Sequence, residues 1–188
     1  MSSAQDRPVG WWVPVSSALA PVALVGGWTL AARLQPAAYD PLRDTISALA
    51  AHGASDRWLM TGALAVLGGC HVLTAVGLRT ARPLGRLVLG AGGVSTALVA
   101  VFAQPAPAHF PVATVSFAAL TLWPVASGLP SRRAGLLATV GLAAALGWFG
   151  IELGRHDLLG LSERVVAGAQ ALWPLVVVVA LRTGLRRS

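Results

Sequence analysis

Residues that could carry acid/base chemistry gather in a few short segments of this 188-residue chain. Asp44 lies in YDPLRDTISALAAHG (residues 39–53), while Glu152 and Glu163 flank LGRHDLLGLS (residues 153–162) near the C-terminus. Carboxyl groups beside apolar sequence are candidate general acids and bases, because burial and neighbouring charges adapt them to proton transfer. His109, at the end of QPAPAH, adds a side chain that can shuttle protons. We therefore predict that Asp44, Glu152, Glu163 and His109 are catalytic.

Polar and aromatic residues of the same segments are candidates for binding a substrate. An arginine can hold an anionic group, a serine can donate a hydrogen bond, and a tryptophan can form an apolar cavity wall. Each also has a structural explanation. Arg155 can pair with Glu152, Ser162 can cap a helix whose dipole Glu163 complements, and tryptophans can mark the membrane interface. The predicted substrate-binding residues are Ser47, Arg155, Arg164, Trp28 and Trp148.

The sequence predicts neither a metal nor a cofactor. His109, Asp44 and Glu163 could together hold a metal ion, but the chain has no HExxH motif and no paired ligands at helical spacing. The single cysteine, Cys70, lies inside an apolar run and offers no disulfide.

The composition predicts that these residues are positioned by membrane-spanning helices. The chain is 55% hydrophobic and 11% charged, whereas soluble domains carry about 25% charged residues. Crossing a bilayer takes about 20 apolar residues, and six such stretches follow one another. We predict an all-α, polytopic membrane protein forming one transmembrane domain over residues 1–188, with spans at about 11–34, 57–78, 84–104, 109–129, 134–153 and 163–181.

The distribution of arginine predicts the orientation, because cytoplasmic loops are enriched in basic residues. With both termini cytoplasmic, nine arginines lie inside (7, 79, 82, 86, 132, 133, 182, 186 and 187) and five outside (33, 43, 57, 155 and 164). Every acid except Asp6, and three of four histidines, then lie at the outer face. The arginines border apolar runs, so the net charge of +7 does not indicate nucleic-acid binding. The 21 glycines favour close helix packing and make a homo-oligomer plausible.

A short helix is expected over about residues 40–52, between the first two spans. Asp40 suits the position before a helix, and Pro41 suits its first turn. At about 1.5 Å per residue the helix is too short to cross a bilayer. We expect it to lie at the outer interface, with one apolar stripe formed by Leu42, Ile46 and Leu49.

Two motifs, DTISAL (44–49) and GLSER (160–164), resemble those of an uncharacterised family of prokaryotic membrane proteins, domain of unknown function 998. The resemblance extends over about residues 12–182. It implies a multi-span fold in a prokaryotic cytoplasmic membrane, and it implies no activity.

Two functions remain open. The first is a membrane-embedded enzyme whose acid/base site faces the outer leaflet and acts on a lipid-like or isoprenoid-like molecule, for example as a protonation-initiated cyclase or isomerase. The second is a non-enzymatic protein, such as a small transporter, a lipid-binding module or an assembly module. A polar path joining His71 and Gln170 to both faces would favour transport, since ion-coupled carriers use polar groups within the membrane. In each case membrane lipids and a lipid-like small molecule are the expected partners.

Overall fold

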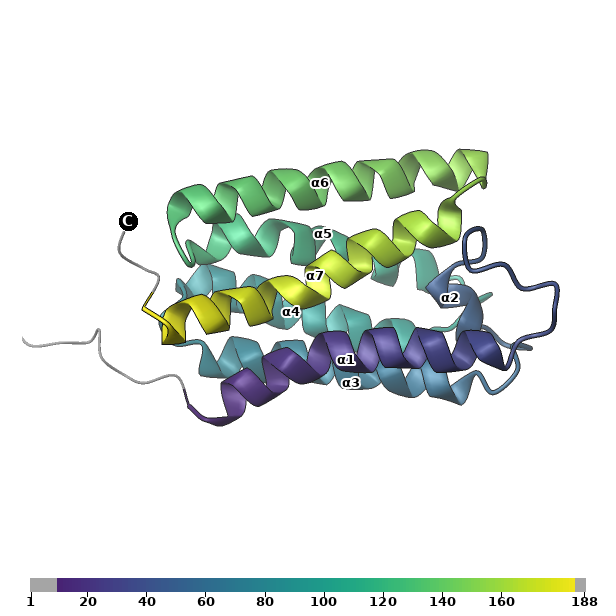
Figure 1. Cartoon of the computed structure of the whole chain (residues 1–188), viewed down its shortest axis with the longest axis horizontal. Helices are drawn as coiled ribbons and strands as arrows, with labels where there is room; N and C mark the ends of the chain where they lie inside the picture. Colours follow the sequence, from purple (N-terminus) through teal and green to yellow (C-terminus); the bar gives the residue numbers. More distant parts are fainter. Residues whose placement is uncertain (1–9, 185–188) are drawn as a thin grey trace, which may run out of the picture.

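Six long helices and one short helix make up the protein. The computed structural model describes residues 10–184, and every regular element in that range is helical (Figure 1), as predicted. Asp6, Arg7, Arg186 and Arg187, which contributed to the orientation argument, lie outside these residues. The elements are α1 (Trp12–Arg33), α2 (Ile46–Leu49), α3 (Trp58–Gly77), α4 (Pro83–Val101), α5 (His109–Ser127), α6 (Arg132–Arg155) and α7 (Leu159–Arg182).

The six long helices form a closed ring. Each helix packs mainly against its two neighbours in the order α1, α3, α4, α5, α6, α7, and α7 returns to α1. Both ends of the described chain lie at one end of the bundle, and α2 lies at the other (Figure 1). We call these the termini end and the α2 end.

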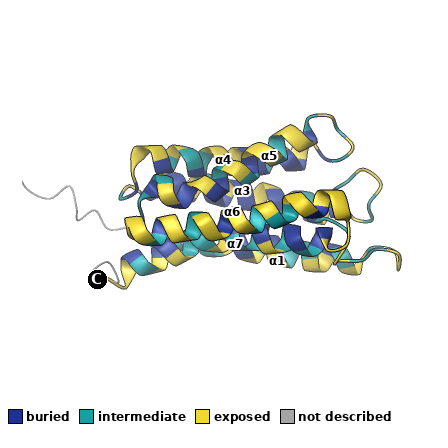
Figure 2. Cartoon of the chain, turned by 90° about the horizontal axis from the view of Figure 1, so that it is seen from above, coloured by how far each residue is buried: buried dark blue, intermediate teal, exposed yellow. Residues whose placement is uncertain are grey.

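The outer surface of the bundle is apolar along its length. All six long helices are long and apolar enough to cross a membrane, yet only 17–44% of the residues in their most apolar windows are buried inside the protein. Exposed positions run along the outside of the helices (Figure 2). Exposure of so much apolar surface is unfavourable in water but favourable in the hydrocarbon core of a bilayer. The six helices are therefore transmembrane spans.

Polar pairs and glycines join the helices where they face one another. The Ser16 and Thr74 hydroxyls lie 2.9 Å apart between α1 and α3, and those of Thr96 and Ser116 lie 2.7 Å apart between α4 and α5. Gly93 lets α4 approach α3 closely, because a Cβ there would lie 2.6 Å from the Gly68 carbonyl oxygen. Such contacts are typical of helix association in lipid.

The short helix is present, but it is shorter than expected and begins later. It covers only Ile46–Leu49, and the Thr45 hydroxyl accepts a hydrogen bond from the Ala48 N–H (3.0 Å) as its cap. Asp40 instead accepts from the Leu42 N–H (2.9 Å) in a tight turn. An aspartate can satisfy nearby backbone in a turn as readily as at a helix start, and here the turn is formed.

Helix α7 begins earlier than the predicted sixth span. It starts at Leu159 rather than near residue 163, so Ser162 and Glu163 lie inside the helix. The Ser162 hydroxyl donates back to the Leu159 carbonyl (2.9 Å) instead of capping the helix. The predicted roles of Ser162 as a cap and of Glu163 as a first-turn acid were therefore wrong, and the burial of Glu163 needs another explanation.

Candidate functional site

Arg164 of α7 holds the non-helical segment that precedes α2. Its Nη1 donates to the carbonyl oxygens of Pro41 (2.7 Å), Asp44 (2.8 Å) and Gly160 (2.9 Å). Its Nη2 donates to the Tyr39 hydroxyl. Backbone groups outside helices need such partners at membrane depth, because lipid offers none. Arg164 thereby binds residues 39–44 to α7.

A glycine in α7 makes this contact possible. A Cβ on Gly160 would collide with the Asp44 carbonyl oxygen and lie 2.6 Å from that of Pro41. At the next residue of α7, the Leu161 N–H donates to the Leu42 carbonyl (3.0 Å). The segment before α2 therefore lies directly on the helix backbone.

Glu163 is buried beneath this segment, with only 4% of its surface exposed. The Ile46 N–H donates to its Oε2, and the Ser47 hydroxyl donates to its Oε1 (3.2 Å). Both donors belong to α2, so the short helix covers the carboxyl group. Within residues 10–184 the one ion pair joins Arg43 and Asp40 (3.8 Å), lies at the surface and does not involve Glu163. Glu163 is thus a buried carboxyl group held by hydrogen bonds and not by a cation.

A cavity of about 690 Å³ lies beside Glu163, between α5, α6 and α7. Its volume is in the range of small-molecule sites. Its walls are mostly apolar, and several of its lining residues, including Phe110 and Leu153, are exposed, so it opens along α5 and α6. The polar groups that line it are Thr45, Ser47, Gln104, His109, Thr114, His156 and Glu163.

His109 lies at the start of α5 and lines the same cavity. Its ring is 3% exposed, and Nδ1 lies 2.9 Å from the Phe102 carbonyl oxygen. A carbonyl only accepts, so Nδ1 carries the hydrogen and Nε2 of the neutral ring is left as an acceptor. His109 and Glu163 are the two predicted catalytic residues that the structure brings to one cavity.

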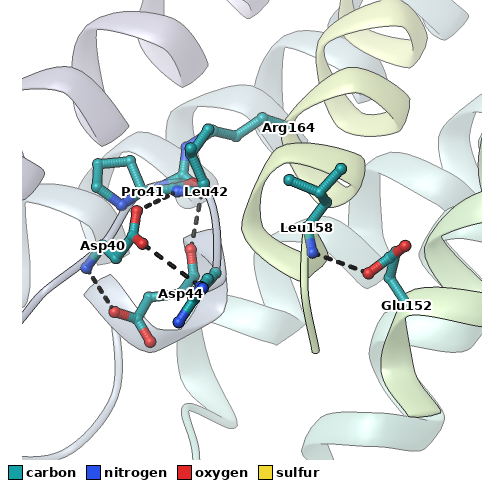
Figure 3. Close-up of polar contacts among 8 residues, drawn as sticks. Asp40, Pro41, Leu42, Asp44, Glu152, Leu158 and Arg164 are labelled. Carbon is teal, nitrogen blue, oxygen red and sulfur yellow. Dashed lines mark hydrogen bonds and ion pairs between the residues drawn. The ribbon is translucent and has the colours of Figure 1, made fainter. Parts of the chain in front are cut away.

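Asp44 and Glu152 each accept a hydrogen bond from nearby backbone (Figure 3). The Asp44 carboxylate accepts from the Asp40 N–H (2.7 Å) and closes the turn before α2. Glu152 is 5% exposed and accepts from the Leu158 N–H (2.8 Å), which joins the end of α6 to the start of α7. Both carboxylates thus stabilise local backbone, and neither is among the residues that line the cavity.

Among the predicted substrate-binding residues, only Ser47 lines the cavity. Arg155 is exposed at the end of α6, and Arg164 is engaged with backbone carbonyls. Trp28 packs against the buried cluster around Leu24, and Trp148 is half-buried outside the cavity lining.

Phenylalanines, not the tryptophans, form the aromatic walls. The Phe117 and Phe149 rings lie 5.4 Å apart between α5 and α6, and Phe110 lines the opening. The predictions missed all three. Phe110 and Phe117 are seven residues apart on one helix face, but that spacing does not distinguish a cavity from lipid when every face of a helix is apolar.

Tyr39 lies outside the membrane spans, and its hydroxyl has a shifted pKa. Burial raises the pKa of its hydroxyl, although the Arg164 guanidinium lowers it in part. The neutral hydroxyl is therefore favoured where it accepts from Arg164.

These features define a multi-pass integral membrane protein with a cavity near one end of its helix bundle. The chain belongs to the family described as "Protein of unknown function (DUF998)", whose model matches residues 18–180 and confirms the resemblance of its motifs. No curated protein and no solved structure matches the chain.

Proposed function

We propose that the protein binds a lipid-like or isoprenoid-like molecule in the cavity between α5, α6 and α7. The observation that carries this proposal is a buried carboxyl group, Glu163, at the edge of a large apolar cavity that opens along membrane-facing helices. Apolar pockets with a few polar groups are typical of small-molecule sites. The apolar chain of the ligand would contact Phe117 and Phe149, and its polar end would lie near Glu163.

Retention of a ligand tests this proposal. We expect the purified wild type to retain a lipid-like molecule and to bind added farnesol, an isoprenoid alcohol, in native mass spectrometry. Gly150→Leu should abolish both, because Gly150 lines the cavity and nothing lies within 4 Å of a Cβ there. Gly141→Leu is the matched control, since Gly141 has equal space on the same helix but does not line the cavity. Equal retention by the two variants would refute a ligand in this cavity.

Acid/base catalysis on that molecule is the second candidate, supported by the shared cavity of Glu163 and His109. Glu163 would transfer its proton to an alkene carbon, which leaves a carbocation and a carboxylate. Loss of a proton from the adjacent carbon to the carboxylate would then give an isomerised alkene and restore Glu163. Attack of a second double bond of the same molecule on the carbocation, before that proton is lost, would instead form a C–C bond and give a cyclised alkene. His109 could take the proton in place of the carboxylate and return it to Glu163, so neither product involves a net change in atoms. A hydrogen-bonded carboxyl group in an apolar cavity suits such a step.

Deuterium incorporation separates catalysis from binding. In D2O the wild type should place deuterium in a farnesol-derived alkene product, and Glu163→Gln should not. Glu152→Gln is the control, because Glu152 does not line the cavity. Wild type that binds farnesol without incorporating deuterium would eliminate this catalysis and leave binding intact.

We further propose that the α2 end faces outward from a prokaryotic cytoplasmic membrane. Arg79, Arg82, Arg86, Arg132, Arg133 and Arg182 lie near the termini end, which is the side that the positive-inside rule assigns to the cytoplasm. A cysteine introduced at Gly53 should react with a membrane-impermeant maleimide in intact cells. Labelling only after lysis would show that the α2 end faces the cytoplasm and would overturn the proposed orientation.

A further inference from the structure

A second, smaller cavity lies in the middle of the bundle. Its volume is about 50 Å³, and helices α1 to α5 and α7 contribute to its lining. Ser47, Ala113, Phe117 and Glu163 line both this central cavity and the large one. Glu163 therefore stands between the two.

His71 of α3 lines the central cavity and has no partner for its polar atoms. Its side chain is 1% exposed, and neither ring nitrogen has a hydrogen-bond partner within residues 10–184. Helix α4 packs closely against α3 at this position, since a Cβ on Gly93 would lie 2.9 Å from the His71 Cβ. A neutral imidazole always has one donor and one acceptor, and leaving both unpaired in an apolar interior costs free energy.

The size and polarity of the cavity indicate what satisfies His71. A water molecule needs about 10–15 Å³ of such volume and two to four polar partners, so a volume of about 50 Å³ holds a few water molecules. Other polar side chains line the cavity: the Thr96–Ser116 pair, Ser47, Gln170 and Glu163. An apolar occupant would leave the ring nitrogens unpaired.

We propose that the central cavity is a water site in which ordered water bridges His71 to the Thr96–Ser116 pair and continues to Glu163. The site gives Glu163 a proton-exchange route into the middle of the membrane. The route is distinct from the large cavity and does not depend on any ligand bound there.

The surroundings of His71 favour a route toward the α2 end. One turn toward the termini end, the Thr74 hydroxyl is already bonded to Ser16. Beyond it the interior is filled by an apolar cluster that includes Leu89 and Trp123. Glu163 is the carboxyl group that lines the cavity, and it lies on the other side. The water therefore connects to Glu163 and ends at His71.

Water contact at His71 tests the proposal in the unmodified protein. Solid-state NMR of the wild type in lipid bilayers, with nitrogen-15 in histidine and tryptophan, measures polarisation transfer from water to each ring nitrogen. The His71 signal is assigned by its loss in His71→Gln. Trp123 is an internal control, because its Nε1 is also buried and unpartnered in the described chain but does not line the cavity. We expect several-fold faster transfer to His71 than to Trp123, and equal rates would overturn the proposal.

Two variants test the direction of the route. Glu163→Gln should slow exchange of the His71 ring hydrogen with D2O several-fold, since a carboxamide between the cavities exchanges hydrogens far more slowly than a carboxyl group does. Thr74→Val should leave that exchange unchanged, because it alters the opposite side of His71. Slowing by Thr74→Val alone would overturn the route through Glu163.

Discussion

Both ends of the bundle contain a buried apolar cluster, but only the α2 end adds a set of hydrogen bonds between α7 and the chain around α2. At the termini end, apolar side chains from α1, α3, α4, α5 and α7 pack into a buried cluster: Val13, Leu78, Leu89, Trp123, Val177 and Val178 are among its members. At the α2 end, hydrogen bonds from α7 hold a non-helical segment, through Arg164, Leu161 and Glu163. Apolar packing therefore holds the termini end, whereas the α2 end combines apolar packing around Leu49 and Met60 with directional hydrogen bonds.

The hydrogen bonds at the α2 end also shape the candidate site. Buried apolar side chains pack closely, because each void forfeits dispersion contacts. An open hollow of about 620 Å³ at the termini end therefore lies on the outside of the bundle, between α3 and α4. Hydrogen bonds fix directions without filling space, so the α2 end can retain a cavity of about 690 Å³ beside α7. The segment that satisfies its backbone on Arg164 also brings the Ile46 N–H to Glu163. Structural support and the candidate site are therefore parts of one arrangement.

The largest effect should come from the packed end. Trp123→Ala removes a side chain that is 1% exposed, and we expect the free energy of unfolding to fall by on the order of 3 kcal/mol. Trp11→Ala is the control, because Trp11 is 78% exposed. Thermal unfolding in detergent measures both variants. Equal melting temperatures of the two variants would show that apolar packing around Trp123 does not stabilise the termini end.

A smaller loss is expected where α7 touches the segment before α2. Gly160→Ala places a Cβ against the Asp44 and Pro41 carbonyl oxygens and should cost about 1–3 kcal/mol by overpacking. The matched substitution, Gly154→Ala on α6, meets nothing within 4 Å and should be neutral. The same unfolding assay compares them, and a neutral Gly160→Ala would mean that the segment can move away from α7 at little cost.

Removal of the Arg164 guanidinium should loosen the α2 end while leaving the termini end intact. Arg164→Met leaves three carbonyl oxygens without this donor, and we expect a loss of about 1–2 kcal/mol. Proteolysis within residues 34–57 should become faster. Arg155→Met, at an exposed arginine, should leave the cleavage rate unchanged. Arg164→Lys should restore little, since an ammonium group lacks the planar fork. Full protection in Arg164→Met would contradict the proposed role.

The smallest effect concerns pH. Burial raises the pKa of Tyr39, so its contribution to stability is complete below the unfolded-state pKa of about 10. That contribution is lost as the pH rises through the higher folded-state value. Tyr39 is the single tyrosine of the chain, so its ultraviolet absorbance reports its ionisation directly. Tyr39→Phe should remove this part of the alkaline loss, and an unfolding profile identical to that of wild type would show that Tyr39 does not contribute.

Much of the fold was predictable because the bilayer constrains each span. The predicted span near residues 84–104 corresponds to α4 (Pro83–Val101), and the span near 57–78 to α3 (Trp58–Gly77). The start of α7 was not predictable in the same way. A glutamate at an apolar boundary favours an interfacial position, but the helix begins four residues earlier, at Leu159, and α2 covers Glu163 and supplies its hydrogen-bond donors.

The candidate site was predictable only in part. Glu163, His109 and Ser47 were selected for their chemistry, and all three line one cavity. Asp44 was selected on the same grounds, yet its carboxylate closes a local turn. Glu163 and Asp44 are both acids beside apolar sequence. Which of them lines the cavity depends on the backbone N–H groups that lie near each carboxyl group in the fold.

The sequence by itself determined that the chain crosses a membrane six times and that six of its seven acids and three of its four histidines gather at one end, because span length and composition are local properties. Only the tertiary structure decided which carboxyl group is buried and where the cavity lies. The bond between Ile46 and Glu163 joins residues 117 positions apart, and the cavity requires α5, α6 and α7 together. Such contacts depend on how the helices pack around one another, and in helices that are apolar on every face the residue pattern does not specify that packing.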